Sequence, residues 1–157
     1  MTTKNIKNQG FTLVELLIVI VIIAILTVVS LVAYNGLQNQ AKTSAAKSAA
    51  DAVAKKAELY NTAKSKYPTN LQALTDKTVG TPPVSQTGEP YHLDESTVKK
   101  GTLGAVGATP TTIPTEANTI EYEVCPTGST SPTGAHVKYY NFSTSHVEER
   151  TIGTCAP

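Results

Sequence analysis

The acidic residue Glu15 stands out because it is the one charged side chain inside a long apolar segment. Between Phe11 and Ala33, 19 of 23 residues are apolar. An ionisable group in hydrocarbon costs several kcal/mol unless it is paired or lies near the interface with water. Two interpretations stay open. Either Glu15 lies at that interface, or it pairs with a cation from another subunit, since the segment itself contains no cation.

Cys125 and Cys155 are the two cysteines of the chain, and both lie in a loop-rich C-terminal region. Two well-separated cysteines favour one disulfide and an oxidising compartment. They do not suit a zinc site, which takes about four ligands and usually includes close pairs of them. A bridge between them would close a loop of about 30 residues and stabilise the fold by roughly 3–4 kcal/mol in the chain-entropy model.

The remaining reactive side chains form no catalytic pattern. His92, His136 and His146 lack the spacing of metal ligands, so surface histidines are the expected outcome. Glu148-Glu149 is interpreted as a solvated acidic edge, and no Asp-rich loop supports calcium binding. Asn141-Phe142-Ser143 matches the short N-glycosylation pattern. We therefore expect no catalytic residues, no metal and no cofactor.

The apolar segment has the length of a membrane helix, about 34 Å against a bilayer core of about 30 Å. A buried core helix is disfavoured, because Leu, Ile, Val and Phe make up only about 15% of the chain from Tyr34 onward. A cleaved secretory signal is disfavoured because a cut after Ala33 would leave Leu31 at a position that favours small residues. Lys4 and Lys7 precede the segment, which places the N-terminus in the cytoplasm and the tail outside.

The run from Lys7 to Glu15, Lys-Asn-Gln-Gly-Phe-Thr-Leu-Val-Glu, resembles the processing site of type IV pilins. In that family a short basic leader ends in glycine, followed by Phe-Thr-Leu-x-Glu and a long apolar helix. The resemblance is strong over residues 4 to about 66. It implies that a membrane-embedded prepilin peptidase cuts after Gly10 and methylates the new amino group of Phe11. It also implies that Glu15 pairs with the N-terminal amine of a neighbouring subunit during assembly.

One long helix is expected from Phe11 to about Lys66. Alanine and lysine are strong helix formers, and the residue before Pro68 resists the helical conformation. In the family this segment often contains a helix-weakening Gly and Pro, but this chain has Ala24 and Val32 at the corresponding positions. The stripe expected to pack on a sheet consists of Leu37, Ala41, Ala45, Ala49, Val53, Leu59 and Ala63.

Turn-forming residues dominate residues 68–118, where we expect a connecting region with a short helix at Leu71–Thr75 and a strand near Tyr91–Leu93. Alternating apolar residues then predict an antiparallel meander of three strands, Thr119–Cys125, Ala135–Phe142 and His146–Ile152. The expected fold class is α+β, with a long N-terminal helix packed on a small antiparallel sheet. Similarity to the pilin family implies that the Cys125–Cys155 bridge fastens the last strand.

These features divide the chain into a leader (1–10), a membrane and assembly helix (11–33), the outer half of the helix (34–67), a connecting region (68–118) and a sheet with the disulfide region (119–157). Residues 34–66 carry a net charge of +4, and residues 67–157 a net charge of −4. Such asymmetry favours self-association through complementary charges. DNA binding by the lysine-rich face lacks support, because arginine and interleaved aromatic residues are absent there.

The resemblance implies a structural subunit, not an enzyme, that polymerises into a type IV pilus for adhesion, twitching motility or DNA uptake. Its expected partners are other copies of the chain, the cytoplasmic membrane, the prepilin peptidase and the pilus assembly machinery. The subunit would lie in the cytoplasmic membrane before assembly and in a surface filament afterwards. One alternative is a pseudopilin of a type II secretion or competence system. Another is a membrane-anchored binding module that never polymerises, for which Glu15 would have no use.

Overall fold

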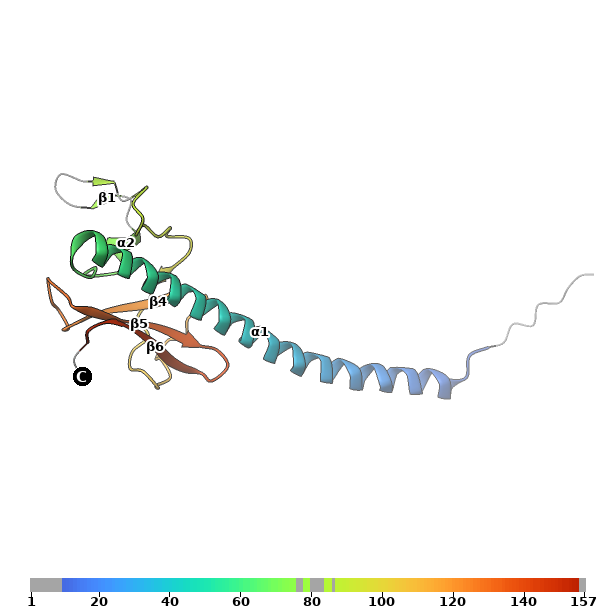
Figure 1. The fold of residues 1–157 in the computed structure, drawn as a ribbon. Helices are drawn as coiled ribbons and strands as arrows, with labels where there is room; N and C mark the ends of the chain where they lie inside the picture. Colours follow the sequence, from blue (N-terminus) through green and yellow to red (C-terminus); the bar gives the residue numbers. More distant parts are fainter. Residues whose placement is uncertain (1–9, 76–77, 80–83, 86, 156–157) are drawn as a thin grey trace, which may run out of the picture. The chain divides into compact units, whose positions relative to one another are not determined.

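A computed structural model describes residues 10–75, 78–79, 84–85 and 87–155. The elements in chain order are α1 (Leu13–Lys64), α2 (Gln72–Thr75), β1 (Thr78–Val79), β2 (Val84–Ser85), β3 (Lys99–Lys100), β4 (Thr119–Cys125), β5 (Gly134–Asn141) and β6 (His146–Gly153). Figure 1 labels all of them except β2 and β3. The chain divides into two compact units, Met1–Gln38 and Asn39–Pro157. The α+β class expected from the sequence is confirmed.

Helix α1 is continuous through Ala24, Val32 and Gly36. Each of these residues permits a helix, because none is a proline in the helix interior. The helix ends where Ser65 takes a left-handed conformation with φ of 56°, and the Ser65 N–H donates to the carbonyl of Asn61 at 2.8 Å. This left-handed C-terminal cap stops the helix at Lys64, two residues before the expected end.

The second unit is built around a four-stranded sheet in the order β3-β4-β5-β6. The pairs β4–β5 and β5–β6 are antiparallel, which confirms the predicted meander. The short strand β3 adds a parallel pair with β4, so the sheet is mixed. A strand of two residues is too short to show the alternation of apolar and polar residues from which strands are predicted.

Alanine forms most of the helix side of the main core. The buried residues of α1 are Ala46, Ala49, Ala50, Val53, Ala54 and Ala57. They share one hydrophobic cluster with larger sheet residues, including Ile120, Val137 and Ile152. Small helix side chains allow the helix and sheet backbones to approach closely, while the larger sheet side chains fill the space between them.

The expected helix stripe was largely wrong. Ala49 and Val53 are buried, whereas Leu37, Ala41, Ala45, Leu59 and Ala63 are exposed. Residues four apart drift by about 40° per step around the helix, so a long row of such residues leaves the contact face. Because alanine occurs on every side of this segment, composition did not distinguish the buried face.

The connecting region contains α2, which confirms the predicted short helix, and an antiparallel pair of β1 and β2. The strand expected near Tyr91–Leu93 was wrong, since these residues form turn and irregular structure. Tyr91 and Leu93 are instead buried anchors, and the Leu93 N–H donates to the Leu74 carbonyl at 2.8 Å. Their apolar character reflects packing on the core and not membership of a sheet.

Candidate functional site

The first candidate site lies at the start of α1, where Thr12 and Glu15 form a reciprocal cap. The Glu15 Oε2 atom accepts hydrogen bonds from the Thr12 N–H at 2.9 Å and the Thr12 hydroxyl at 2.7 Å. In return, the Glu15 N–H donates to the Thr12 hydroxyl oxygen at 3.2 Å. This is the capping box of a Thr-x-x-Glu sequence, which satisfies backbone N–H groups at a helix start. The sequence analysis did not predict the capping role of Thr12, although the Thr-x-x-Glu spacing indicates it.

The apolar surface around Glu15 has no cover among the described residues. Every described residue from Gly10 to Lys42 is exposed, with Phe11 at 77% and Leu13 at 87%. A continuous apolar surface of this length requires lipid or another protein to cover it. The N-terminal part of α1 is also long and apolar enough to cross a membrane. Membrane anchoring by this segment agrees with these properties.

The expected cleavage junction lies outside the helix. Gly10 and Phe11 precede α1 and are both exposed. A Cβ atom added to Gly10 would meet no atom of the described residues within 4 Å. The described part of the fold therefore does not require a glycine at this position.

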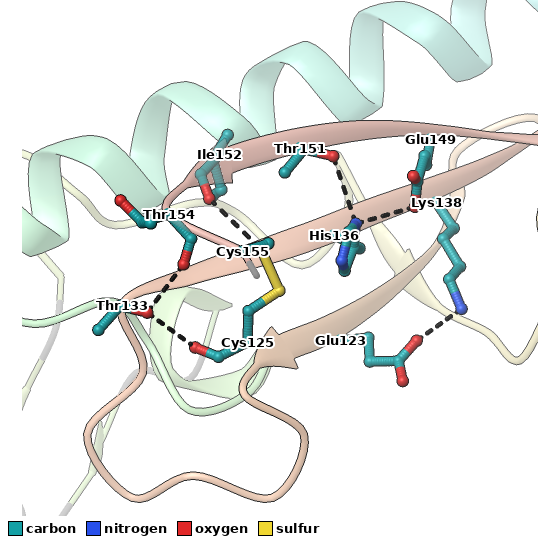
Figure 2. The surroundings of a disulfide bond; sticks show 10 residues. All are labelled: Glu123, Cys125, Thr133, His136, Lys138, Glu149, Thr151, Ile152, Thr154 and Cys155. Atoms are coloured by element: carbon teal, nitrogen blue, oxygen red, sulfur yellow. Dashed lines mark hydrogen bonds and ion pairs between the residues drawn. A yellow bond between two sulfur atoms is a disulfide. The ribbon is translucent and has the colours of Figure 1, made fainter. Parts of the chain in front are cut away.

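The second candidate site surrounds the predicted disulfide between Cys125 and Cys155, which the structure confirms with a Cα–Cα distance of 5.2 Å. The bridge joins the end of β4 to the segment after β6 (Figure 2). Gly134 stands opposite Cys125 on β5, and a Cβ atom there would lie 3.1 Å from the Cys155 sulfur and 2.4 Å from the Ile152 carbonyl oxygen. A glycine is needed at this position because any side chain would clash with the strand beside it.

Charged side chains line the sheet face next to the disulfide. Lys138 on β5 donates from Nζ to Glu123 Oε2 on β4 at 2.6 Å, and its Nζ lies 3.9 Å from Glu121 Oε1. The hydrogen bond from Lys138 is the largest cause that holds the pKa of Glu123 below its usual range. His136 Nδ1 lies 2.9 Å from Glu149 Oε2 on β6 (Figure 2). The three carboxylates outnumber the single lysine, so this face is locally negative.

The histidines, which sequence reasoning treated alike, occupy different surroundings. His92 lies in a turn and contains a buried Nε2 atom that has no hydrogen-bond partner among the described residues. His146 is exposed at the start of β6, where its Nδ1 contacts the Thr144 carbonyl oxygen. His136 alone of the three lies beside the disulfide, because the β4–β5 register brings it onto the same sheet face.

On the opposite face of the sheet, Asn141 has a structural role. Its amide nitrogen donates to Glu148 Oε1 at 2.6 Å, and its side-chain oxygen accepts from the Ser143 N–H at 2.9 Å and from the Thr43 hydroxyl of α1 at 3.2 Å. Asn141 is 8% exposed. Because this side chain is buried and its nitrogen is bonded to Glu148, the folded chain does not present Asn141 for N-glycosylation.

Glu148 accepts two hydrogen bonds on this face, from Asn141 and from the Tyr139 hydroxyl at 2.6 Å. The Tyr139 bond is the largest cause that lowers the pKa of Glu148. Burial, followed by the hydrogen bond to Glu148, raises the pKa of Tyr139 to about 12. Both shifts favour an ionised Glu148 beside a neutral Tyr139.

Glu148→Gln is expected to lower the free energy of unfolding by about 1–2 kcal/mol at pH 7, because it replaces a charged acceptor with a neutral one. A lowered carboxyl pKa stabilises the fold above the ordinary value of about 4.3, and this stabilisation is lost as pH falls through the lowered pKa. The difference in the free energy of unfolding between the variant and the wild type should therefore become smaller below about pH 4. Urea unfolding of the detergent-solubilised chain at pH 7 and pH 3 measures it, with exposed Glu95→Gln as control. Equal differences at both pH values would contradict the prediction.

Comparison with protein-family models matches residues 5–31 to the prokaryotic N-terminal methylation motif. No curated protein and no solved structure matches the chain. The matched segment contains the Gly10-Phe11 junction, Glu15 and most of the exposed apolar part of α1. Together with the α+β fold, this motif supports a structural protein of the type IV pilin-like or pseudopilin class, with the leader typical of a prepilin.

Proposed function

We propose that this chain is the subunit of a type IV pilus filament, formed after a prepilin peptidase removes residues 1–10 and methylates Phe11. The observation that carries the proposal is the coincidence of the methylation motif with an apolar helix that has no cover among the described residues. Removal of the leader leaves this helix at the very start of the mature chain. The helix can then serve first as a membrane anchor and afterwards as the packing element of a filament.

Gly10 supports the processing step. Among the described residues no atom would touch a side chain at this position, so the described fold does not explain why glycine stands there. Recognition by a peptidase that requires a small residue at the cut does explain it. The junction is also exposed and non-helical, which lets an extended backbone enter a protease active site.

Glu15 supports the assembly step. Cleavage creates an amino group at Phe11, four residues before this carboxylate. Two such charges in an apolar environment are stable when they pair, and loss of one partner of a buried pair costs about 3–5 kcal/mol. A neighbouring subunit at the wrong stagger would leave both charges unpaired, so the pair would select the register between subunits.

The head is the second unit, with its sheet and disulfide, and it would form the filament surface outside the cell. The disulfide favours a pilus over a pseudopilus, because it strengthens a domain exposed to the extracellular medium. The surface functions of such a filament would be adhesion, twitching motility or DNA uptake. A non-polymerising anchored module is disfavoured, because an anchor needs neither the methylation motif nor Glu15.

The processing step predicts that the mature protein begins at Phe11 and carries one additional methyl group. Intact-mass measurement of the membrane or filament protein tests this directly. Gly10→Val should abolish cleavage and leave the N-terminus in front of Phe11, since the larger side chain meets no atom of the folded chain but would obstruct the peptidase.

The matched control is Gly36→Ala, which also places a side chain in open space but lies in α1, away from the junction. It should be processed normally. A wild-type mature chain that begins at Met1 or near Tyr34 would contradict the processing proposal.

A further inference from the structure

The two cysteines and His136 lie close together in space although they are distant in the chain. Their potential ligand atoms, the two Sγ atoms and one imidazole nitrogen, all lie within 4.8 Å of one another. They come from the end of β4, from β5 and from the segment after β6, on one sheet face (Figure 2). Ligand atoms of a tetrahedral zinc site lie about 3–4 Å apart, given bonds of about 2.0–2.3 Å. In this structure the two sulfur atoms are bonded to each other as a disulfide, so they would have to separate on reduction to reach that spacing, whereas the imidazole nitrogen already lies within 4.8 Å of both.

Glu149 already orients the imidazole. Its Oε2 atom lies 2.9 Å from His136 Nδ1, and the Thr151 hydroxyl lies 3.3 Å from the same nitrogen. A carboxylate that accepts a hydrogen bond from the Nδ1–H group leaves the Nε2 lone pair available to a metal. Metal-binding histidines commonly have this carboxylate partner, which also increases the basicity of the ligand.

The site opens onto a pocket of about 510 Å³ whose lining includes Cys125, His136, Glu123 and Glu149. This pocket gives a hydrated ion access and leaves room for a water molecule as fourth ligand. The local excess of carboxylates, Glu121, Glu123 and Glu149 against Lys138, also favours a cation. Two thiolates and one imidazole are the ligands preferred by borderline-soft divalent ions such as zinc.

We propose that the dithiol form of this head binds a divalent metal of the zinc type through Cys125, Cys155 and His136, with Glu149 as the positioning residue. Binding releases the two thiol protons as the two metal–sulfur bonds form, and no electron is transferred. The metal and the disulfide exclude each other, because both use the same two sulfur atoms. The dithiol form is the state of every newly synthesised chain before oxidation. In that state the metal would fasten the C-terminal segment to β4, as the disulfide does afterwards.

The test is a titration of the full chain in detergent with Co²⁺, after reduction by a water-soluble phosphine and removal of other metals. The reduced wild type should bind one Co²⁺ per chain and show a thiolate-to-cobalt charge-transfer band with the intense visible bands of tetrahedral cobalt. His136→Ala should weaken Co²⁺ binding by more than the roughly 100-fold upper bound for loss of an outer partner, because it removes a direct ligand. Glu149→Gln should weaken it by about 10-fold, because it removes the carboxylate partner of the ligand.

His146→Ala is the matched control, since His146 lies on β6 but outside the cluster, and it should bind Co²⁺ as the wild type does. The unreduced protein should not bind. Circular dichroism before and after reduction reports whether the sheet persists. The proposal is overturned if the reduced chain loses its sheet, if it shows no tetrahedral cobalt spectrum, or if His136→Ala binds with unchanged affinity. None of these results bears on filament assembly, which is tested separately.

Discussion

Glu15→Gln is expected to abolish surface filaments while cleavage after Gly10 and membrane insertion continue. Glutamine keeps an oxygen that can accept the hydrogen bonds from Thr12, so the start of α1 retains its cap. The substitution removes the negative charge, and the Phe11 amine of the neighbouring subunit would then be buried without a partner. At about 3–5 kcal/mol for each subunit contact, that loss is large enough to prevent polymerisation. Glu15→Ala should give the same result.

Electron microscopy of surface filaments, combined with intact mass of the membrane fraction, measures assembly and processing separately. Thr12→Ala is the matched control. It removes the hydroxyl of the capping box, at a cost of about 1 kcal/mol, but leaves the Glu15 charge in place. We expect this variant to form filaments. Normal filaments from Glu15→Gln, together with their loss in Thr12→Ala, would show that Glu15 acts as a helix cap and would refute the assembly role.

The double variant Cys125→Ser/Cys155→Ser is expected to lower the free energy of unfolding by about 3–4 kcal/mol. The bridge spans a sequence separation of 30 residues, and its loss restores the conformational freedom of that loop in the unfolded chain. This is a large share of the roughly 5–15 kcal/mol that is typical of a domain. The sparse apolar composition of the head leaves few other interactions to compensate.

Urea unfolding of the detergent-solubilised chain measures this effect, with a chelator present so that no metal binds the reduced wild type. Reduced wild type should unfold at nearly the same urea concentration as the double variant. Glu95→Gln, an exposed change in the head, serves as the neutral control. Equal midpoints for the oxidised wild type and the double variant would contradict the prediction, as would alkylation of both cysteines in the unreduced protein.

Local pattern was sufficient for most of the secondary structure. The strand Thr119–Cys125 was predicted with its observed bounds, because Ile120, Tyr122 and Val124 alternate with charged residues. The helix was predicted within two residues at each end, from its apolar segment and the Tyr67-Pro68 pair. The disulfide followed from the cysteine count. The helix and the strand are determined by residues near one another in the chain. The disulfide has one possible pairing, because the chain has two cysteines.

Features that depend on packing were predicted poorly. The buried face of the outer helix could not be identified, because alanine provides no contrast between one side and another. Tyr91 and Leu93 were assigned to a strand, although they are buried as members of the main hydrophobic core, where the Leu93 N–H bonds to Leu74 of α2. The mixed character of the sheet depends on the two-residue strand β3, which pairs with a strand about 20 residues away in the chain.

The sequence by itself determined the chemistry that we propose for the N-terminal region. Gly10, Phe11 and Glu15 lie in an exposed segment, where spacing along the chain would also be spacing in the proposed site. The tertiary structure alone decided the surroundings of the disulfide. His136 does not have the spacing of a metal ligand in the sequence, yet an imidazole nitrogen of His136 lies within 4.8 Å of both sulfur atoms. The reason is the register, which pairs Cys125 with Gly134. His136 follows Gly134 by two residues, so its side chain lies on the same face of the sheet as Cys125. Cross-strand register is set by packing of the whole sheet, and no local pattern contains it.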